Sequence, residues 1–141
     1  MDKRILVVED EFRVLAVIKK RLESAGYEVL TAMDGQEGLE VAREAKPDLI
    51  VLDLMLPKMD GYAVCRELRH DTALQYTPIL MLTARAQEGD IQRGMMTGAD
   101  AYMTKPFQHS MLLDRIEEML DKSARESAQR AEMNPPRKPP E

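Results

Sequence analysis

Acidic, hydroxyl and basic side chains follow four separate apolar runs in this chain of 141 residues. They are Glu9 and Asp10 after the first run, Asp53 after the second, Thr83 after the third and Lys105 after the fourth. Mg²⁺ prefers carboxylate oxygens as ligands, and a carboxylate can also attack phosphorus as a nucleophile. An ammonium and a hydroxyl can stabilise the negative charge of a phosphoryl group. The set is therefore suited to hold a hard divalent cation and a phosphoryl group.

The apolar runs indicate how these side chains come together. Runs at residues 5–8, 49–52, 79–82 and 101–104 fit strands of a parallel sheet that is buried on both faces. They alternate with helical patterns as far as about residue 120, which is typical of repeated βαβ units. Parallel strands place their carboxyl ends on one edge, where open α/β sheets bind ligands. We therefore expect the polar residues to meet at that edge.

The remaining elements are predicted from helical spacing and from breakers. A fifth strand is expected over residues 27–32, and Asp60 is expected to cap the third helix. After Leu120 the apolar stripe of the last helix fades, and 123–133 is polar with alanines that could extend the helix into solvent. Helices are predicted over 11–25, 34–46, 61–70, roughly 87–97, and from 108 or 109 onward.

The domain organisation follows from these elements. We expect one domain over residues 1–122, and a helical extension with a tail or linker over 123–141. Residues 134–141 are rich in proline and charge and are expected to be disordered or extended.

Composition narrows the class of protein. The hydrophobic fraction of 44%, the charged fraction of 32% and the net charge of −5 indicate an ordinary globular domain that does not itself bind nucleic acid or an anionic membrane. Cys65 is the one cysteine, which excludes an intrachain disulfide and favours a cytoplasmic protein in which Cys65 is a packing residue. Eleven methionines favour a core filled by thioethers over a methionine-rich interaction groove.

Each polar residue taken alone also has a structural explanation. Acids at strand ends often cap the next helix, Thr83 could be a plain strand residue and Lys105 a solvated charge. Their joint occurrence in this order favours the functional interpretation. His70 and His109 have no partner ligands at metal spacing and are expected to face solvent.

Four stretches resemble the receiver domain of bacterial two-component response regulators. The resemblance covers about residues 3–122, with all five polar positions in order at family-like spacing, and rests on Ile5–Asp10, Asp48–Gly61, Leu82–Ala84 and Gly98–Phe107. It implies a CheY-like, flavodoxin-like fold of the doubly wound (βα)5 type, with three layers and the parallel strand order 2-1-3-4-5. Periodicity alone predicts the alternation of strands and helices but not this order.

The resemblance also implies roles around a metal ion. Asp53 would accept a phosphoryl group from the phosphohistidine of a sensor kinase or of a histidine phosphotransfer protein. Asp10, Asp53 and the main-chain carbonyl of Met55 would bind Mg²⁺, for which Mn²⁺ could substitute, and Glu9 would act through water.

Further roles concern the phosphoryl group and the signal. Thr83 would donate to a phosphoryl oxygen, Lys105 would pair with the group, and the Lys105–Pro106 peptide would be cis. Tyr102 would rotate inward as Thr83 moves, which would alter the surface of the fourth helix, fifth strand and fifth helix. Met55 and Arg85 match positions that influence the loss of phosphate.

The same surface lacks part of the charge pattern by which many transcriptional members dimerise. The acids expected beside Asp100 and early in the last helix are replaced by Ala101 and Met111, although Asp100 and Arg115 are compatible. This difference favours another dimer or a different partner protein, so the chain could be a monomer or a phosphorylation-dependent dimer.

Three functions compete. The first is a stand-alone receiver that binds a partner when phosphorylated, and the second is the receiver part of a longer regulator with a DNA-binding or enzymatic output domain. The third is a phosphatase of the aspartyl-phosphate type, which usually needs a second acid two residues after the nucleophile. Met55 stands there, which argues against a turnover enzyme.

Overall fold

A parallel sheet of five strands forms the centre of the molecule, in the order β2-β1-β3-β4-β5. The computed structural model describes residues 2–84, 92 and 96–133. The strands are β1 (Arg4–Val8), β2 (Glu28–Ala32), β3 (Leu49–Asp53), β4 (Ile79–Thr83) and β5 (Ala101–Thr104). The order implied by the resemblance is therefore confirmed.

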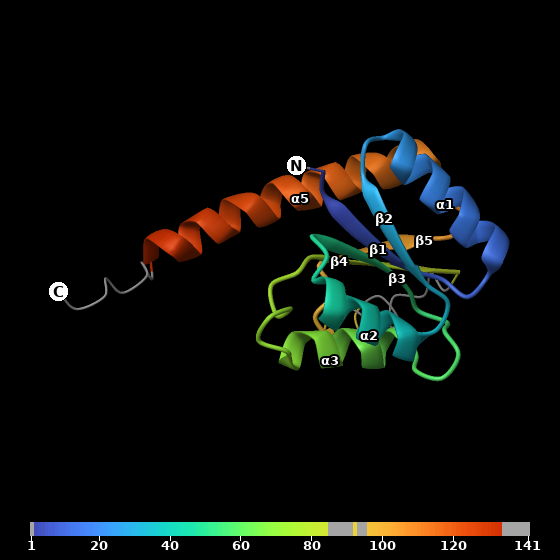
Figure 1. Cartoon of the computed structure of the whole chain (residues 1–141), viewed down its shortest axis with the longest axis horizontal. Helices are drawn as coiled ribbons and strands as arrows, with labels where there is room; N and C mark the ends of the chain where they lie inside the picture. Colours follow the sequence, from blue (N-terminus) through green and yellow to red (C-terminus); the bar gives the residue numbers. More distant parts are fainter. Residues whose placement is uncertain (1, 85–91, 93–95, 134–141) are drawn as a thin grey trace.

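Helices cover both faces of this sheet (Figure 1). Helices α1 and α5 lie on one face, and α2 and α3 lie on the other. Their bounds are Phe12–Ser24 for α1, Gly35–Ala45 for α2, Gly61–His70 for α3 and His109–Met133 for α5. The helix predicted over 87–97, and Arg85 with it, lie largely or wholly outside the described residues.

The continuous apolar runs supply a core on each side of the sheet. In β1, Leu6 and Val8 pack toward α2 and α3, whereas Ile5 and Val7 pack toward α1 and α5. Successive side chains of a strand point to opposite faces, so a strand buried on both faces needs an unbroken apolar sequence. This burial holds the strands in register and fixes where their carboxyl ends lie.

Methionines do not fill this core, which corrects the expectation from composition. Among the described methionines, Met81 and Met119 are buried. Branched aliphatic side chains of the strands fill the interior instead, because they pack well on a pleated sheet. Five methionines are 39–87% exposed: Met33, Met55, Met96, Met111 and Met133.

Three further side chains were predicted with different success. His70 is exposed as expected, but His109 is half-buried, with its ring edge-on to that of Phe107 at 5.8 Å. The expectation for His109 is wrong because Phe107 lies against the first turn of α5. Cys65 is buried, its thiol lies 3.3 Å from the Thr97 carbonyl, and burial raises its pKa, which suits a packing residue.

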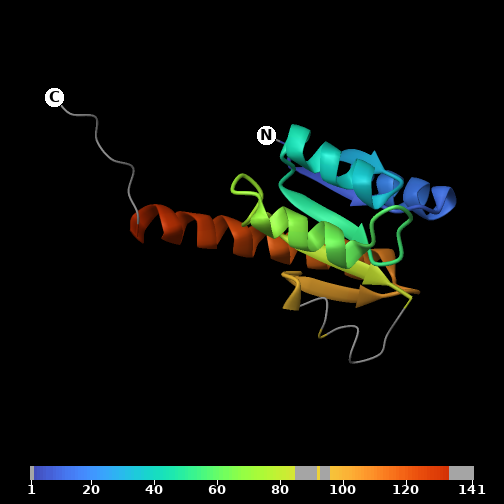
Figure 2. The ribbon, with the colours of Figure 1, turned by 90° about the horizontal axis from the view of Figure 1, so that it is seen from below.

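Helix α5 continues well past the sheet (Figures 1 and 2). Its 25 residues include the predicted polar extension as far as Met133. The Arg130 guanidinium lies 3.9 Å from the centre of the Tyr76 ring, in the segment between α3 and β4. This cation–π contact joins the extension to the body of the domain. Among the described residues, none of the helices is both long enough and apolar enough to cross a membrane.

Candidate functional site

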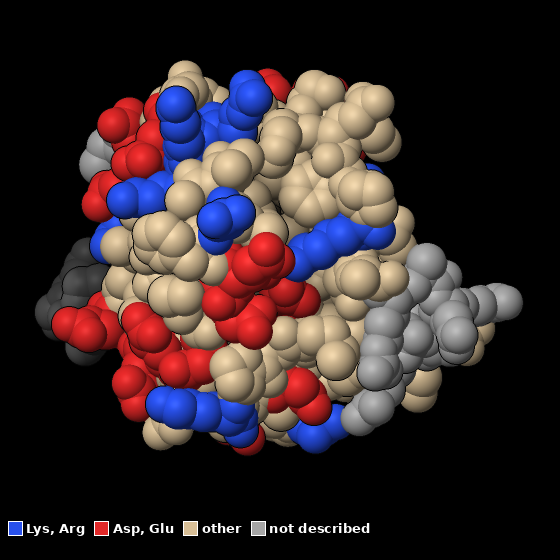
Figure 3. Space-filling model, turned by 90° about the vertical axis from the view of Figure 1, so that its right-hand side faces the viewer, with Lys and Arg blue, Asp and Glu red and all other residues tan. Residues whose placement is uncertain are grey.

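The predicted polar residues meet at the edge where the strands end. Asp53 is the last residue of β3, and Thr83 is the last residue of β4 beside it. Glu9 and Asp10 follow β1, and Lys105 follows β5. Figure 3 shows acidic side chains grouped near the middle of this face, with basic side chains beside them.

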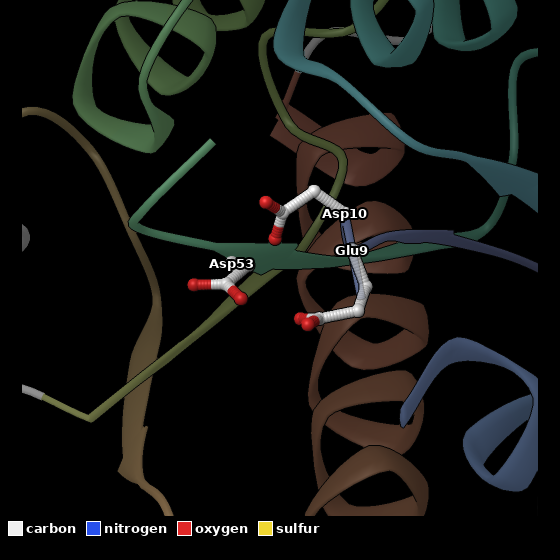
Figure 4. A group of neighbouring side chains, drawn as sticks. All are labelled: Glu9, Asp10 and Asp53. Carbon is white, nitrogen blue, oxygen red and sulfur yellow. The ribbon is translucent and has the colours of Figure 1, made fainter. Parts of the chain in front are cut away.

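Three carboxylates form the centre of the site. Glu9, Asp10 and Asp53 each offer an oxygen, and these oxygens lie within 4.8 Å of one another. Figure 4 shows the three side chains converging from the ends of two neighbouring strands. Glu9 and Asp53 are buried, with 2% and 4% exposed, whereas Asp10 faces solvent. Such a cluster of hard oxygen donors with one exposed member fits a divalent cation that retains several waters.

Lys105 offsets part of this negative charge. Its ammonium lies 2.8 Å from Asp53 Oδ2 and 3.0 Å from Glu9 Oε2. Burial lowers the pKa of Lys105, but the hydrogen bonds and charges of the two carboxylates outweigh burial and raise it above its usual value. Lys105 is therefore a positive charge at neutral pH, held against the carboxylate of Asp53.

Glu9 has the most perturbed carboxyl group of the site. Burial, followed by the neighbouring Asp53, raises its pKa from 4.5 to about 7, although Lys105 acts in the opposite direction. Three acids face one described cation here, and a second cation would relieve their mutual repulsion. The donor set and its surplus of negative charge therefore both fit a bound metal ion.

The phosphoryl-accepting candidate, Asp53, is oriented on both of its oxygens. Oδ1 accepts a hydrogen bond from the Met55 N–H at 3.0 Å, while Oδ2 accepts from Lys105. Met55 itself is 52% exposed at the mouth of the site. A carboxylate held in this way presents a defined face to an incoming group.

The ends of β4 and β5 are joined beside Asp53. The Lys105 N–H donates to the Thr83 carbonyl at 2.7 Å, and Thr83 is fully buried. The Lys105–Pro106 peptide is cis, as the resemblance implies. Tyr102 is half-buried and packs on the core that lies toward α2 and α3.

Asp100 is exposed, as sequence reasoning expected, and the structure also gives it partners within its own chain. Asp100 Oδ2 accepts from the Arg69 guanidinium at 2.6 Å and from the Ile79 N–H at 2.8 Å. Arg69 also donates to the carbonyls of Gly98 and Thr77. The role of Arg69 could not be predicted from the neighbouring sequence, because its partners are as many as 31 residues away.

Comparison with known proteins agrees with this geometry. The family model described as "Response regulator receiver domain" matches residues 5–117. The chain is 49% identical to the alkaline phosphatase synthesis transcriptional regulatory protein PhoP of Bacillus subtilis, over 87% of this chain and 50% of that protein. It is 44% identical to the transcriptional regulator RpaA of Synechocystis, over 86% of this chain and 51% of that protein. The chain thus spans about half the length of these relatives.

Solved structures show the same architecture. The chemotaxis protein CheY4 of Vibrio cholerae is 34% identical, with a TM-score of 0.81 over 84% of this chain and 99% of that chain. The receiver domain of the sensor histidine kinase PA1611 of Pseudomonas aeruginosa is 33% identical, with a TM-score of 0.80 over 86% of this chain and 99% of that chain. That structure has a magnesium ion coordinated in its active-site cleft. On the family match, the fold and these relatives, the chain belongs to the response regulator receiver domains of two-component signalling.

Proposed function

We propose that Asp53 accepts a phosphoryl group from the phosphohistidine of a sensor histidine kinase or of a histidine phosphotransfer protein. The observation that carries this proposal is the placement of Asp53 between the Lys105 ammonium and the Met55 N–H, beside two further acids. An Asp53 oxygen attacks phosphorus, the bond from phosphorus to the histidine nitrogen breaks, and an aspartyl-phosphate remains.

The residues around Asp53 would hold Mg²⁺, with Mn²⁺ as a substitute. Asp10, Asp53 and the Met55 main-chain carbonyl are the direct ligands, and Glu9 acts through water. The cation supplies positive charge against the phosphoryl oxygens during transfer. Lys105, which bonds Asp53 and Glu9, would contribute a second positive charge, and Thr83 would donate its hydroxyl to a phosphoryl oxygen.

The phosphorylated site would then act as a switch for a partner. Thr83 moves toward the phosphoryl group and Tyr102 rotates into the space that it leaves, which biases an existing equilibrium. The half-buried position of Tyr102 on β5, next to β4, supports this coupling. The surface that changes includes β5 and α5, and it binds a downstream protein or a second copy of the chain.

Mass spectrometry after incubation with a phosphoramidate and Mg²⁺ tests the acceptor. We expect a gain of about 80 Da, the mass of one phosphoryl group, that needs Mg²⁺ and is absent in Asp53→Asn. Asp60→Asn, which changes the N-cap acid of α3, is the matched control and should keep the adduct. An adduct of equal yield in Asp53→Asn would contradict the proposal.

The site is proposed to store one phosphate and not to turn over. Met55 stands two residues after Asp53, and an apolar side chain there cannot act as a general acid. A colorimetric phosphomonoester assay should therefore show no release beyond one equivalent of protein. Multiple turnovers that disappear in Asp53→Asn would establish a phosphatase instead.

A second proposal concerns the whole protein. The relatives are transcriptional regulators of which this chain spans about half, so residues 1–122 would be the receiver of a longer regulator. Residues 123–141 would then connect it to a DNA-binding or other output domain. The coding sequence downstream of Glu141 tests this alternative directly, because a stop codon there would leave the stand-alone receiver.

A further inference from the structure

The loop over residues 54–60 connects β3 to α3 and carries the Met55 main chain toward Asp53. In the proposed function, on which this inference rests, that main chain supplies an N–H to Asp53 and a carbonyl to the cation. The position of the loop therefore decides whether both groups face the site. Contacts at the base and at the tip of the loop could fix this position.

The base of the loop is closed by Gly61. The Gly61 N–H donates to the Leu54 carbonyl at 2.9 Å. A Cβ at Gly61 would lie 2.6 Å from the Asp53 carbonyl oxygen and 2.8 Å from Leu54 Cα. Glycine is thus required for the close approach of two backbone segments, and the first residue of α3 is packed directly on the phosphoryl-accepting strand end.

The tip of the loop lies against the first residue of α2. The Pro57 carbonyl accepts the N–H of Gly35 at 3.3 Å and the N–H of Met59 at 2.7 Å. A tight turn makes this possible, with Lys58 in the left-handed region at φ +67°. The Lys58 ammonium also lies 3.6 Å from the carboxylate of Asp34, the N-cap residue of α2.

Gly35 and the Met59 backbone are in closer contact than any larger residue would allow. A Cβ at Gly35 would lie 1.8 Å from the Met59 carbonyl oxygen, whereas real Cβ contacts are essentially never shorter than 3.0 Å. Helix α2 cannot easily give way, because Gly38 one turn later lies against Val8 and Leu39 is buried. The exposed tip would therefore move, by more than about 1 Å, a displacement that matters at a reacting centre.

We propose that Gly35 is a positioning residue for the cation and phosphoryl site. It lets the start of α2 press on the tip of the loop, which sets the Met55 main chain against Asp53 before any ligand arrives. Gly35 contacts neither ligand and acts only through residues 57–59.

The test compares Gly35→Ala with Gly26→Ala in the full chain. Unlike Gly35, Gly26 has a positive φ, of +98°, so alanine is strained there, but it lies at the far end of the sheet with nothing within 4 Å of a Cβ. Both variants should melt at a lower temperature. Calorimetric titration with Mg²⁺ alone should show an increase in Kd of about 10-fold or more for Gly35→Ala, and no change for Gly26→Ala.

Methyl NMR of labelled methionines reports the loop itself. The resonances of Met55 and Met59 should shift in metal-free Gly35→Ala, while that of buried Met119 should not. Wild-type Mg²⁺ affinity in a folded Gly35→Ala would overturn the inference and leave the proposed function intact. A wild-type protein that binds no Mg²⁺ would overturn the proposed function itself.

A second pair of variants applies if Gly35→Ala fails to fold. Lys58 and Lys46 are exposed lysines with positive φ, of +67° and +49°, and a β-branched residue is strained at both. Lys58→Val should increase the Kd for Mg²⁺ severalfold, whereas Lys46→Val, at the end of α2, should not. Equal affinities in the two variants would contradict the role of the loop tip.

Discussion

Glu9 has a side chain whose protonation responds strongly to this fold. Its buried carboxyl has a pKa of about 7 in the folded protein, against 4.5 when exposed. The folded state retains a proton that the unfolded chain releases, so stability falls as the pH rises through this window. A shift of this size corresponds to about 3 kcal/mol.

Urea denaturation of the metal-free protein tests this pH dependence. Between about pH 5 and pH 7.5, the wild type should lose up to about 3 kcal/mol more unfolding free energy than Glu9→Gln, which cannot ionise. Glu11→Gln, an exposed neighbour, should behave as the wild type. Identical pH profiles for wild type and Glu9→Gln would show that Glu9 is ionised throughout.

Met55 is proposed to govern a different property, the lifetime of the phosphoryl group. Its thioether is half exposed at the mouth of the site and cannot orient an attacking water. Met55→Asn should therefore shorten the lifetime about tenfold, a barrier change of about 1.4 kcal/mol, as followed by loss of label from the aspartyl-phosphate. A lifetime equal to or longer than that of the wild type would contradict this role.

The residues of the site could be predicted because each one ends a strand or directly follows one. A carboxylate after an unbroken apolar run is recognisable in the sequence, and parallel strands bring such ends together. The contacts of Gly35 and Arg69 could not be predicted in this way. Their partners lie on other elements, and only the packing of α2 and α3 against the sheet brings them within reach.

At the scale of elements, Arg69 joins the end of α3 to the segments that lead into β4 and β5. Its guanidinium bonds Asp100 and four main-chain carbonyls, with 19% of its side chain exposed. Asp100 is therefore committed within its own chain, although its sequence position is compatible with a pair across a dimer. A planar fork of donors is needed to satisfy these acceptors together.

Replacement of this guanidinium should be costly. Arg69→Lys keeps the charge but cannot bond all the acceptors, so we expect a loss of about 2 kcal/mol in unfolding free energy by urea denaturation. Arg66→Lys, exposed on the same helix, should change it by less than about 0.5 kcal/mol. Equal effects of the two substitutions would show that the Arg69 contacts add little.

Helix bounds were predictable to within a residue or so where caps and breakers are clear. Asp34 and Asp60 accept N–H bonds at the starts of α2 and α3, as short polar side chains do at an N-cap. The core composition was less predictable. Methionine content alone does not reveal that the strands already supply enough branched side chains to fill both sides of the sheet.

At the scale of the whole molecule, the extension of α5 adds length without adding to the sheet core. Buried residues of α5 end at Met119, and the Arg130–Tyr76 contact is worth about 1 kcal/mol at most at such an exposed position. Residues 1–122 should therefore fold without the extension.

A chain ending at Lys122 tests this domain boundary. It should lose less than about 1 kcal/mol of unfolding free energy and should take up the phosphoryl group at the rate of the full chain. Arg130→Gln in the full chain separates the lost contact from the lost helix. A truncated chain that fails to fold would place the extension inside the domain.

The geometry of α5 has a mechanical consequence. The helix starts four residues after Lys105 and runs without interruption for 25 residues, a length of about 37 Å at 1.5 Å per residue. A small tilt of its first turns, which follow Lys105 closely in the chain, would therefore be amplified at its far end. A tilt of about 5° in those first turns would swing Met133 through about 3 Å at this length, so a displacement too small to alter the core is magnified where the chain leaves the domain.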